Sequence, residues 1–380
     1  MRIIYIIDAL AIVGGLERVL IDKMNFLAEN FKYEIFLITT IQGEHPFAFS
    51  LSSKIKHIDL NCVEHRQYNY QYPIRLFIKW NIEHTIKQNI QKHIYEIQPD
   101  IIIGTTKYKA DIICKLKSNA KKIIESHIVK SNSGINDGVK RNPIVQFFYR
   151  LNLMRYNYII KKQSDVIVTL TQGDALEWDE PHKTHIIPNA ITQIATEISS
   201  CENSKVIAAG RLSYQKGFDI LIKVWKQVSL KYPNWKLDIF GEGELENDLK
   251  QQIKEKGLEN VITIHPPTPN IYQEMQNSSI FAFPSRYEGF GLVLIEAMSN
   301  GIPCVSFDCP YGPSDIITDG VDGFLVPNWD IQAMADKICY LIEHKNTRKQ
   351  MGQNAHQAAM RYAPDNIMSI WKELFHNTIN

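Results

Sequence analysis

Short apolar runs recur along the chain, separated by longer segments in which the apolar residues follow a helical spacing. The runs in the first half are RIIYII, YEIFLI, KIKHIDL, DIIIG, KKIIES, DVIVTL and HIIP, and those in the second half are KVIAAG, WKLDIF, VITIH, SIFAFPS, PCVSF and GFLVP. Runs of this length are typical of strands that are buried on both faces. Because they alternate with helical segments, we predict an α/β fold whose parallel sheets are covered by helices on both faces.

The predicted strands are too many for one comfortable sheet, and a polar segment without helical periodicity divides them at residues 186–205. We place a linker there and predict two doubly wound, Rossmann-like domains, residues 1–188 and 189–363, that face a central cleft. Three final helices without intervening strands are predicted at Asp330–His344, Thr347–Arg361 and Pro364–His376. The last of them, within residues 364–380, is expected to pack back on the first domain.

Charge is divided unevenly along the chain. The 380 residues are 44% hydrophobic and 22% charged with a net charge of +1, an ordinary globular composition that points to no nucleic-acid partner. Residues 1–189 hold 25 Lys and Arg against 19 Asp and Glu, which gives +6, and the remaining 17 against 22 give −5. The basic half is either a solvated face or a surface for an anionic partner, such as a phosphate-bearing acceptor or the inner face of the cytoplasmic membrane.

The cysteines and the apolar segments indicate the compartment. The six cysteines form no CxxC pair, and a core of this size needs no disulfides, so reduced thiols are expected. No segment approaches the roughly 18 apolar residues of a membrane-spanning helix. The first apolar run is too short for a signal peptide and suits a buried strand, so we expect a cytoplasmic protein whose membrane contact, if present, is peripheral.

Candidate binding residues follow several predicted strands, where open α/β sheets bind their ligands. Gly14 and Gly15 precede a helical segment and would let a phosphate or sugar approach helix N–H groups, although a plain loop has the same pattern. Arg211 and Lys216 follow the strand KVIAAG. Two cations at a strand end can bind a diphosphate, unless both are simply solvated surface charges.

The stretch RYEGFGLVLIEAMSN, Arg286–Asn300, combines a glycine-rich turn, a predicted helix start and two carboxylates. The turn would place backbone N–H groups at a helix N-terminus, which favours a phosphate. A phosphate repels a carboxylate, so Glu288 is expected to hold neutral sugar hydroxyls. Glu296 interrupts an apolar face and needs a partner, which a pair of ribose hydroxyls would supply. The structural alternatives are a helix-dipole partner for Glu288 and a salt bridge for Glu296.

His127 follows the predicted strand KKIIES. A lone histidine is more often structural, but its position beyond a strand end makes it a functional candidate. The sequence contains no HExxH motif, no clustered His and Cys set and no Asp-x-Asp pair. No dedicated metal site is therefore expected.

A set of short motifs resembles family 4 of the retaining glycosyltransferases, which have the two-domain GT-B fold. The motifs are GGLERV, ESH, IPNAI, AAGRLSYQKGFDILI, FGEGE and FPSRYEGFGLVLIEAMSNGIPCVSFDCPYGPSDIITDGVDGFLVP. The resemblance covers nearly the whole chain and is strongest from Val206 to Pro327. It implies transfer of a sugar from a nucleotide sugar, which is a substrate, with neither a metal nor another cofactor.

The resemblance implies a catalytic role for Glu288, His127, Arg211 and Lys216. Glu288 and Glu296 resemble the family's E-x7-E pair, in which the first acid would contact donor-sugar hydroxyls and the second the ribose. Arg211 and Lys216 would bind the diphosphate. His127 would lie near the donor sugar and the reaction centre.

Further contacts with the phosphates are implied by the same resemblance. The backbone N–H groups of Phe290, Gly291 and Leu292 would add to the diphosphate site. Gly14 and Gly15 would close on the phosphate and the acceptor from the first domain.

The nucleoside would lie at two other strand ends. Gly241 and Glu242 would line the nucleotide side, and the base would lie near His265 and Pro266. Many relatives have a glycine near the latter position, and this departure from the pattern affects the expected base contacts.

The segment FDCPYGPSDII resembles its counterpart in bacterial transferases for capsule, O-antigen and other lipid-linked glycans. This resemblance implies a UDP-linked hexose or N-acetylhexosamine as donor and a glycan acceptor, lipid-linked, at the membrane face. Four alternatives stay open: a nucleotide-sugar epimerase of the same fold, a GDP-mannose-dependent transferase, a nicotinamide dehydrogenase and a non-catalytic nucleotide-sugar-binding protein. The dehydrogenase lacks support because GxGxxG is missing after the first strand.

Overall fold

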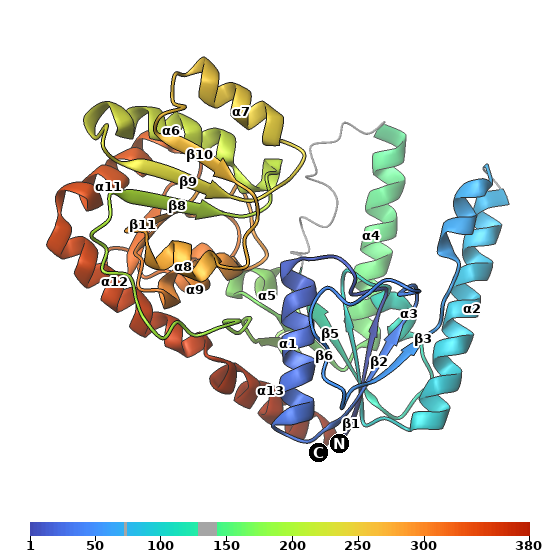
Figure 1. The fold of residues 1–380 in the computed structure, drawn as a ribbon. Helices are drawn as coiled ribbons and strands as arrows, with labels where there is room; N and C mark the ends of the chain where they lie inside the picture. The colour runs from blue at the N-terminus through green and yellow to red at the C-terminus, as the bar shows by residue number, and fades with distance from the viewer. Residues whose placement is uncertain (72–73, 128–142) are drawn as a thin grey trace. The chain divides into compact units, whose positions relative to one another are not determined.

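A computed structural model describes residues 1–71, 74–127 and 143–380, which divide into two compact units (Figure 1). Unit 1 comprises the described residues up to Ile187 together with Met368–Asn380, and unit 2 comprises Pro188–Ile367. In this part of the chain every apolar run predicted as a strand is one, and both sheets are parallel. The predicted α/β fold with two Rossmann-like units is confirmed.

The described residues of unit 1 contain a seven-stranded parallel sheet with the order β3-β2-β1-β4-β5-β6-β7. The strands are β1 (Arg2–Ile7), β2 (Glu34–Thr39), β3 (Lys56–Asp59), β4 (Ile101–Thr105), β5 (Lys121–Ser126), β6 (Val166–Thr169) and β7 (Thr184–Ile186). The central strands β1 and β4 are almost wholly buried, as their continuous apolar sequences predict. The order of the strands reverses between β1 and β4, which makes the end of these two strands a topological switch point.

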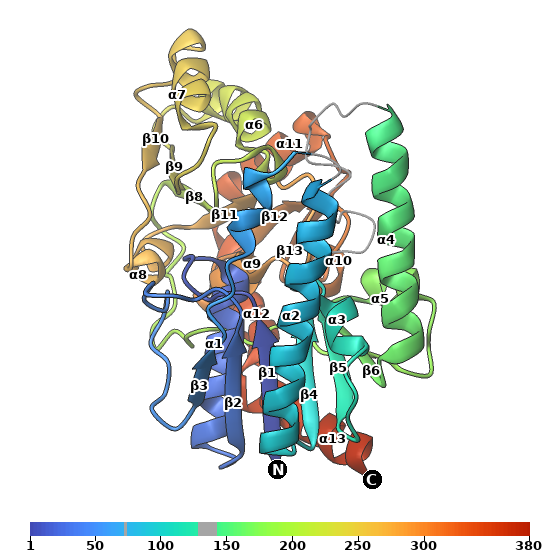
Figure 2. The same cartoon turned by 90° about the vertical axis from the view of Figure 1, so that its right-hand side faces the viewer.

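Helices cover both faces of this sheet (Figures 1 and 2). The helices of unit 1 are α1 (Gly15–Glu29), η1 (Glu64–Asn69), α2 (Ile74–Ile97), α3 (Ala110–Cys114), α4 (Pro143–Gln163), α5 (Gln172–Trp178) and α13 (Pro364–Ile379). Helices α2, α3 and α4 share one core with alternate residues of the strands, such as Ile4 and Ile6. Helices α1 and α13 lie on the opposite face, where Trp371 and Phe375 are buried.

The described residues of unit 2 contain a six-stranded parallel sheet with the order β10-β9-β8-β11-β12-β13. The strands are β8 (Lys205–Ala209), β9 (Lys236–Phe240), β10 (Ile262–His265), β11 (Ile280–Phe283), β12 (Cys304–Phe307) and β13 (Gly323–Val326). Its switch point lies between β8 and β11, so the loops that follow these two strands flank the position where such sheets bind ligands.

The helices of unit 2 are η3 (Tyr214–Lys216), α6 (Phe218–Lys231), α7 (Glu246–Glu255), α8 (Ile271–Gln276), α9 (Leu292–Ser299), α10 (Pro313–Ile316), α11 (Ile331–Glu343), α12 (Lys345–Ala359) and η4 (Met360–Tyr362). One face of the sheet packs against α6, α7 and α11. Residues 187–204, between β7 and β8, form no helix or strand. Within the described residues, no helix combines the length and the apolar character needed to cross a membrane.

Candidate active site

The loops after β8 and β11 bring Lys216 and Glu288 together. Lys216 ends η3, directly before α6, and Glu288 lies in the loop between β11 and α9. The Lys216 Nζ lies 2.6 Å from Glu288 Oε1, and the two side chains are 20% and 6% exposed. A cation and a carboxylate thus meet at the switch point, although they stand 72 positions apart in the sequence. The pair can neutralise a phosphate with the ammonium group and accept hydroxyl hydrogen bonds at the carboxylate.

Arg286 holds these two loops together, a role that the sequence reasoning missed. Its guanidinium donates to both carboxylate oxygens of Asp219 at 2.8 and 2.7 Å and to the carbonyl oxygen of Tyr214 at 2.6 Å. It also lies over the rings of Tyr214 and Trp329, at 4.0 and 5.0 Å from their centres. Its two terminal nitrogens are thus hydrogen-bonded, whereas its buried Nε has no hydrogen-bond partner. The bidentate contact with Asp219 anchors the backbone beside Lys216 and Glu288.

The turn before α9 has the geometry that the glycine-rich motif predicts. Gly291 precedes the helix with φ of +101°, a left-handed conformation that side chains other than glycine seldom adopt. No side chain caps the helix at this position. The Phe290 ring is buried against Tyr362, with ring centres 5.7 Å apart, which anchors the turn to unit 2. Leu292 is the first helical residue, so the first N–H groups of α9 follow the turn directly.

The ends of β9 and β10 carry the residues expected on the nucleoside side. A Cβ atom at Gly241 would lie 1.9 Å from the Gly210 carbonyl oxygen, so only glycine permits the loops after β8 and β9 to approach so closely. His265 stacks on Phe240 at 4.6 Å, and its Nε2 lies 3.1 Å from Asp238. The stacked and hydrogen-bonded ring is held in place, and Pro266 follows it.

Glu296, Arg211 and Glu242 differ in their surroundings. Glu296 is half-buried on α9, and its Oε1 accepts a hydrogen bond from Thr192 Oγ1 at 3.4 Å. A neutral hydroxyl thus supplies part of the compensation that this carboxylate needs on an apolar helix face. Arg211 is exposed directly beyond β8. The backbone of Glu242 accepts a hydrogen bond from Leu212 N at 2.8 Å, which joins the loops after β8 and β9.

In unit 1, the switch point between β1 and β4 carries a second charged cluster. Helix α1 begins at Gly15, with Gly14 as the preceding residue. Glu17, in the first turn, accepts from Lys107 Nζ at 2.7 Å and from the Tyr108 hydroxyl at 2.9 Å. Burial raises the pKa of the Glu17 carboxyl, but these hydrogen bonds outweigh burial and hold the pKa below its ordinary value. An anion that approaches this helix start would therefore meet a carboxylate already neutralised by Lys107.

His127 lies immediately beyond β5, as predicted, and is held by a residue that the sequence reasoning did not select. Its Nε2 lies 2.8 Å from Glu125 Oε2, and the two side chains are 5% and 2% exposed. Residues two apart on a strand point to the same face, so the spacing of Glu125 and His127 could have indicated this contact.

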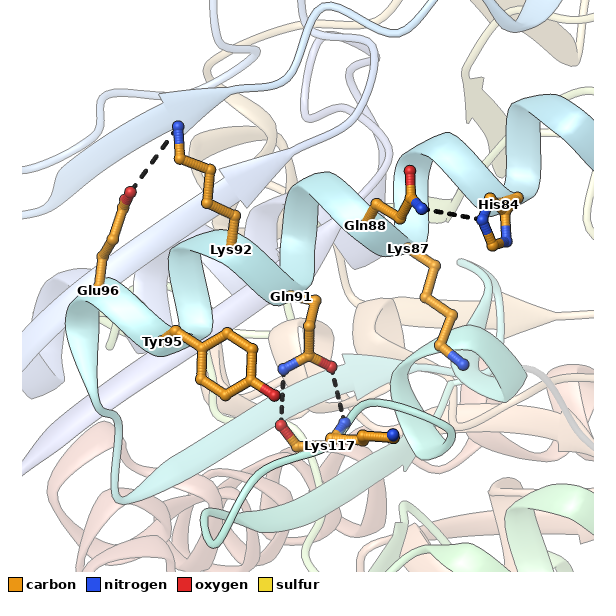
Figure 3. Close-up of a pocket in the computed structure, with 8 residues that line it drawn as sticks. All are labelled: His84, Lys87, Gln88, Gln91, Lys92, Tyr95, Glu96 and Lys117. Carbon is orange, nitrogen blue, oxygen red and sulfur yellow. Dashed lines mark hydrogen bonds and ion pairs between the residues drawn. The ribbon is translucent and has the colours of Figure 1, made fainter.

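An open pocket of about 740 Å³ lies elsewhere on unit 1, along α2 (Figure 3). Its lining residues are His84, Lys87, Gln88, Gln91, Lys92, Tyr95, Glu96 and Lys117. Gln91 joins α2 to the backbone of Lys117 through hydrogen bonds of 2.6 and 2.8 Å. The pocket contains none of the predicted site residues, but three lysines line it, of which Lys87 and Lys92 belong to α2 and Lys117 does not.

A family comparison places the charged pair of unit 2 in a known context. The model of the family "Glycosyl transferases group 1" matches residues 193–358, which include Arg211, Lys216, Glu288 and Glu296. The matched segment thus lies within unit 2 and contains the charged pair. The candidate residues that lie in unit 1 (Gly14, Gly15 and His127) fall outside the matched segment.

Individual relatives extend the comparison to the rest of the chain. The chain is 29% identical over 366 residues to an uncharacterized glycosyltransferase of Haemophilus influenzae, a match that covers 94% of this chain and 95% of the relative. It is 35% identical over 180 residues to the amylovoran biosynthesis glycosyltransferase AmsD of Erwinia amylovora. That match covers 47% of this chain and 50% of AmsD, so it spans about half of each protein.

A solved structure shows the fold. Staphylococcus aureus TarM, as a variant in complex with UDP, α-GlcNAc-glycerol and fondaparinux, superposes with a TM-score of 0.77 at 16% identity. The superposition covers 98% of this chain and 99% of TarM. The chain thus has the GT-B fold, in agreement with the expectation from its motifs.

Proposed function

We propose that this protein is a retaining glycosyltransferase that moves a hexose or N-acetylhexosamine from a UDP-sugar to a lipid-linked glycan acceptor in the synthesis of a cell-surface polysaccharide. The observation that carries the proposal is the contact of Lys216 with Glu288 at the switch point of a glycosyltransferase group 1 domain. The presence of UDP in the TarM complex and the role of AmsD in amylovoran biosynthesis support the donor and the pathway class.

The proposed mechanism assigns the developing charge to unit 2. The bond between the anomeric carbon and the diphosphate oxygen breaks, and negative charge grows on the leaving diphosphate. Lys216, Arg211 and the first N–H groups of α9 would stabilise this charge, so no metal is needed for that purpose. The acceptor oxygen bonds to the anomeric carbon from the face that the diphosphate vacates, which retains the configuration. The hydroxyl proton passes to the leaving phosphate.

Glu288 would orient the sugar during this step. Its Oε1 is taken by Lys216, whereas sugar hydroxyls can donate to the remaining lone pairs of the carboxylate. Glu296 would hold the ribose, and the stacked His265 with Pro266 would lie beside the base. His127 would lie near the reacting sugar.

A thermal-shift series with UDP, GDP, ADP, their common sugar conjugates and NAD tests the donor. We expect UDP and one or two UDP-sugars to raise the melting temperature, because a ligand at about 100 times its Kd stabilises a fold by about 2.7 kcal/mol. Arg211→Ala should remove the shift without unfolding the protein, since Arg211 is exposed. Lys250→Ala, which breaks an exposed ion pair on α7, is the control and should keep it.

Other outcomes of this series separate the alternatives. A shift with GDP compounds alone would overturn the UDP donor and favour a GDP-mannose-dependent transferase. The epimerase alternative requires an assay of the product instead: conversion of UDP-N-acetylglucosamine to its epimer without an acceptor would identify an epimerase. No shift with any nucleotide, from folded protein, would contradict the donor site.

The exposed sides of α2 and α4 support contact of unit 1 with a membrane. The core contacts of these helices begin near Ile82 and Tyr156, and several large apolar side chains that precede or flank these positions are exposed. These side chains, which we call the α2–α4 apolar surface, are Ile74, Phe77, Trp80, Phe147, Phe148, Leu151, Met154 and Tyr158. Figure 2 views unit 1 from the side of these helices.

The charge beside the α2–α4 apolar surface selects an anionic bilayer as the partner. The α4 sequence, Pro143–Gln163, contains four basic residues and no acidic one. In the α2 pocket Lys92 pairs with Glu96, and Lys87 and Lys117 add to this charge. Aromatic side chains beside cations are typical of surfaces that lie at a lipid headgroup boundary.

Sedimentation with lipid vesicles tests this contact. We expect the protein to bind vesicles of phosphatidylglycerol and phosphatidylcholine and not vesicles of phosphatidylcholine alone. Because each basic residue near such a surface contributes about 1 kcal/mol, Arg150→Gln with Arg155→Gln should weaken binding about tenfold or more. Trp80→Ser should also weaken it, whereas Leu230→Ser, an exposed apolar position of α6, should not. Equal binding to both kinds of vesicle, or to neither, would contradict the proposal.

A further inference from the structure

A buried chain of polar contacts leads from His127 into unit 1. Glu125 is the fifth residue of β5 and His127 follows the strand by one residue, so both side chains lie on the same face. Glu125 Oε2 contacts the Nε2 of His127 at 2.8 Å. Its other oxygen, Oε1, accepts from Lys23 Nζ at 2.5 Å. Each oxygen of one carboxylate thus has its own partner.

Lys23, on α1, is itself enclosed by aromatic rings. Its side chain is 2% exposed. The ammonium lies 4.0 Å from the ring centre of Trp371 on α13 and 5.6 Å from that of Tyr5 on β1. Trp371 is buried in turn and contacts Phe375 at 5.5 Å. Elements distant in sequence (α1, β1, β5 and α13) therefore meet around the ion pair of Lys23 and Glu125.

The partners keep Glu125 charged. Burial raises the pKa of the Glu125 carboxyl, but the charge of Lys23 and the hydrogen bond of His127 outweigh burial and lower the pKa to about 2. For Lys23 the balance is opposite: burial lowers the pKa of the ammonium more than its single carboxylate partner raises it. The ionised carboxylate can only accept hydrogen bonds, so the Nε2 of His127 must carry the proton that it donates.

We propose that Glu125 is a positioning residue that fixes the Nε2–H tautomer of His127, and that Lys23, covered by Trp371, holds the carboxylate in place. In this tautomer the Nδ1 atom of His127 carries no proton, so its lone pair can accept a hydrogen bond from a sugar hydroxyl. This inference rests on the proposed function, in which His127 lies near the reacting sugar. It adds Lys23 and the last helix of the chain to the structure that supports the site.

The energetics favour a role beyond stability. A fully buried ion pair usually stabilises a protein no more than apolar residues of the same volume would, because both charges lose their hydration. The Glu125 carboxylate of this pair also binds His127, which gives the buried charges a function besides stability. Carboxylates orient metal-binding histidines in the same way.

The test compares Glu125→Gln with the double variant Glu125→Gln/Lys23→Met. The single variant leaves the Lys23 ammonium buried without its counter-ion and should be less stable, whereas the double variant removes the unpaired charge and should regain most of the lost melting temperature. If Glu125 positions His127, the double variant should stay about 10- to 100-fold slower than the wild type in kcat, with the donor KM nearly unchanged. Exchange of the exposed Glu246 and Lys250 pair for Gln and Met is the matched control and should change neither value.

The tautomer itself provides a readout independent of activity. Long-range ¹H–¹⁵N spectra of protein labelled in histidine should show the Nε2–H form of His127 in the wild type, with the signal assigned by its loss in His127→Gln. The double variant should show a mixture of tautomers, because a glutamine amide can either accept from Nε2 or donate to it. A double variant with restored stability, wild-type kcat and an unchanged tautomer would overturn the inference.

The two proposals fail in different ways. Full transfer activity in His127→Ala would remove His127 from the reaction and would contradict that part of the proposed function. A wild-type His127 in the Nδ1–H form would contradict the inference, whatever the activity.

Discussion

Replacement of Lys216 with alanine is expected to lower the rate of sugar transfer about 100- to 1,000-fold, the usual effect of removing one group that stabilises a developing anion. Lys216 is the cation at the switch point of unit 2, and its ammonium lies 2.6 Å from Glu288. Without it the leaving diphosphate loses a positive partner, and Glu288, which is 5% exposed, retains a charge without its counter-ion. The measurement is the kcat and KM for a UDP-sugar identified by thermal shift.

Two further variants separate these effects. Lys216→Arg keeps the charge and should recover part of the rate, whereas Lys250→Ala should leave it unchanged because its ion pair with Glu246 is exposed. Glu288→Gln should lower kcat, since an amide presents a weaker acceptor to the sugar hydroxyls. Wild-type kinetics in a folded Lys216→Ala protein would place the donor diphosphate elsewhere.

Replacement of Lys23 with methionine is expected to destabilise unit 1 by about 3–5 kcal/mol, the typical cost of breaking a buried ion pair on one side. The change leaves the Glu125 carboxylate, which is 2% exposed, with His127 as its partner and removes the cation that lies over Trp371. Hydrogen exchange of the β1 and β5 amides reports unit 1 separately from unit 2. A loss of this size should raise the slowest exchange rates about 100- to 5,000-fold.

Acid provides an independent check of the same pair. The pKa of Glu125 is about 2 in the folded protein against 4.5 for the free side chain. Because the folded value is lower, the ionised carboxylate stabilises unit 1 fully above pH 4.5, and this contribution disappears as the pH falls toward 2. Glu125→Gln should lack this contribution, which amounts to about 3 kcal/mol, so wild-type and variant stabilities should converge in acid. Curves that stay parallel from pH 5 to pH 2 would show that Glu125 does not carry the effect.

Much of the fold could be predicted from local patterns. Runs such as RIIYII and SIFAFPS are apolar throughout, and in an α/β protein a strand covered by helices on both faces requires that pattern. The predicted bounds of the last helix, Pro364–His376, were also close to the observed bounds, Pro364–Ile379. The candidate residues were found in the same way, because strand-end loops can be located once the strands are known. The assigned roles of these residues in binding and catalysis stay predictions.

The contacts between those residues were not predictable from spacing. Lys216 and Glu288 were expected to bind different parts of the donor, yet in the structure they bind each other across 72 positions. Arg286 received no role from the sequence, because its partner Asp219 belongs to α6, 67 positions away. Glu125 was passed over within the motif ESH because Lys23, its other partner, lies 102 positions away.

The sequence by itself determined the α/β class, the two parallel sheets and the loops that follow their strands. A strand buried on both faces requires consecutive apolar residues, and the turn before a helix requires residues such as glycine, so both leave a pattern in neighbouring positions of the sequence. Only the tertiary structure decided which charges are neutralised and by which partners. The reason is physical: the strand order places β8 beside β11 and β1 beside β4, and a charge that loses its hydration there must be compensated by whichever side chain the sheet brings within about 3 Å. For His127, that side chain is Glu125, with Lys23 behind it.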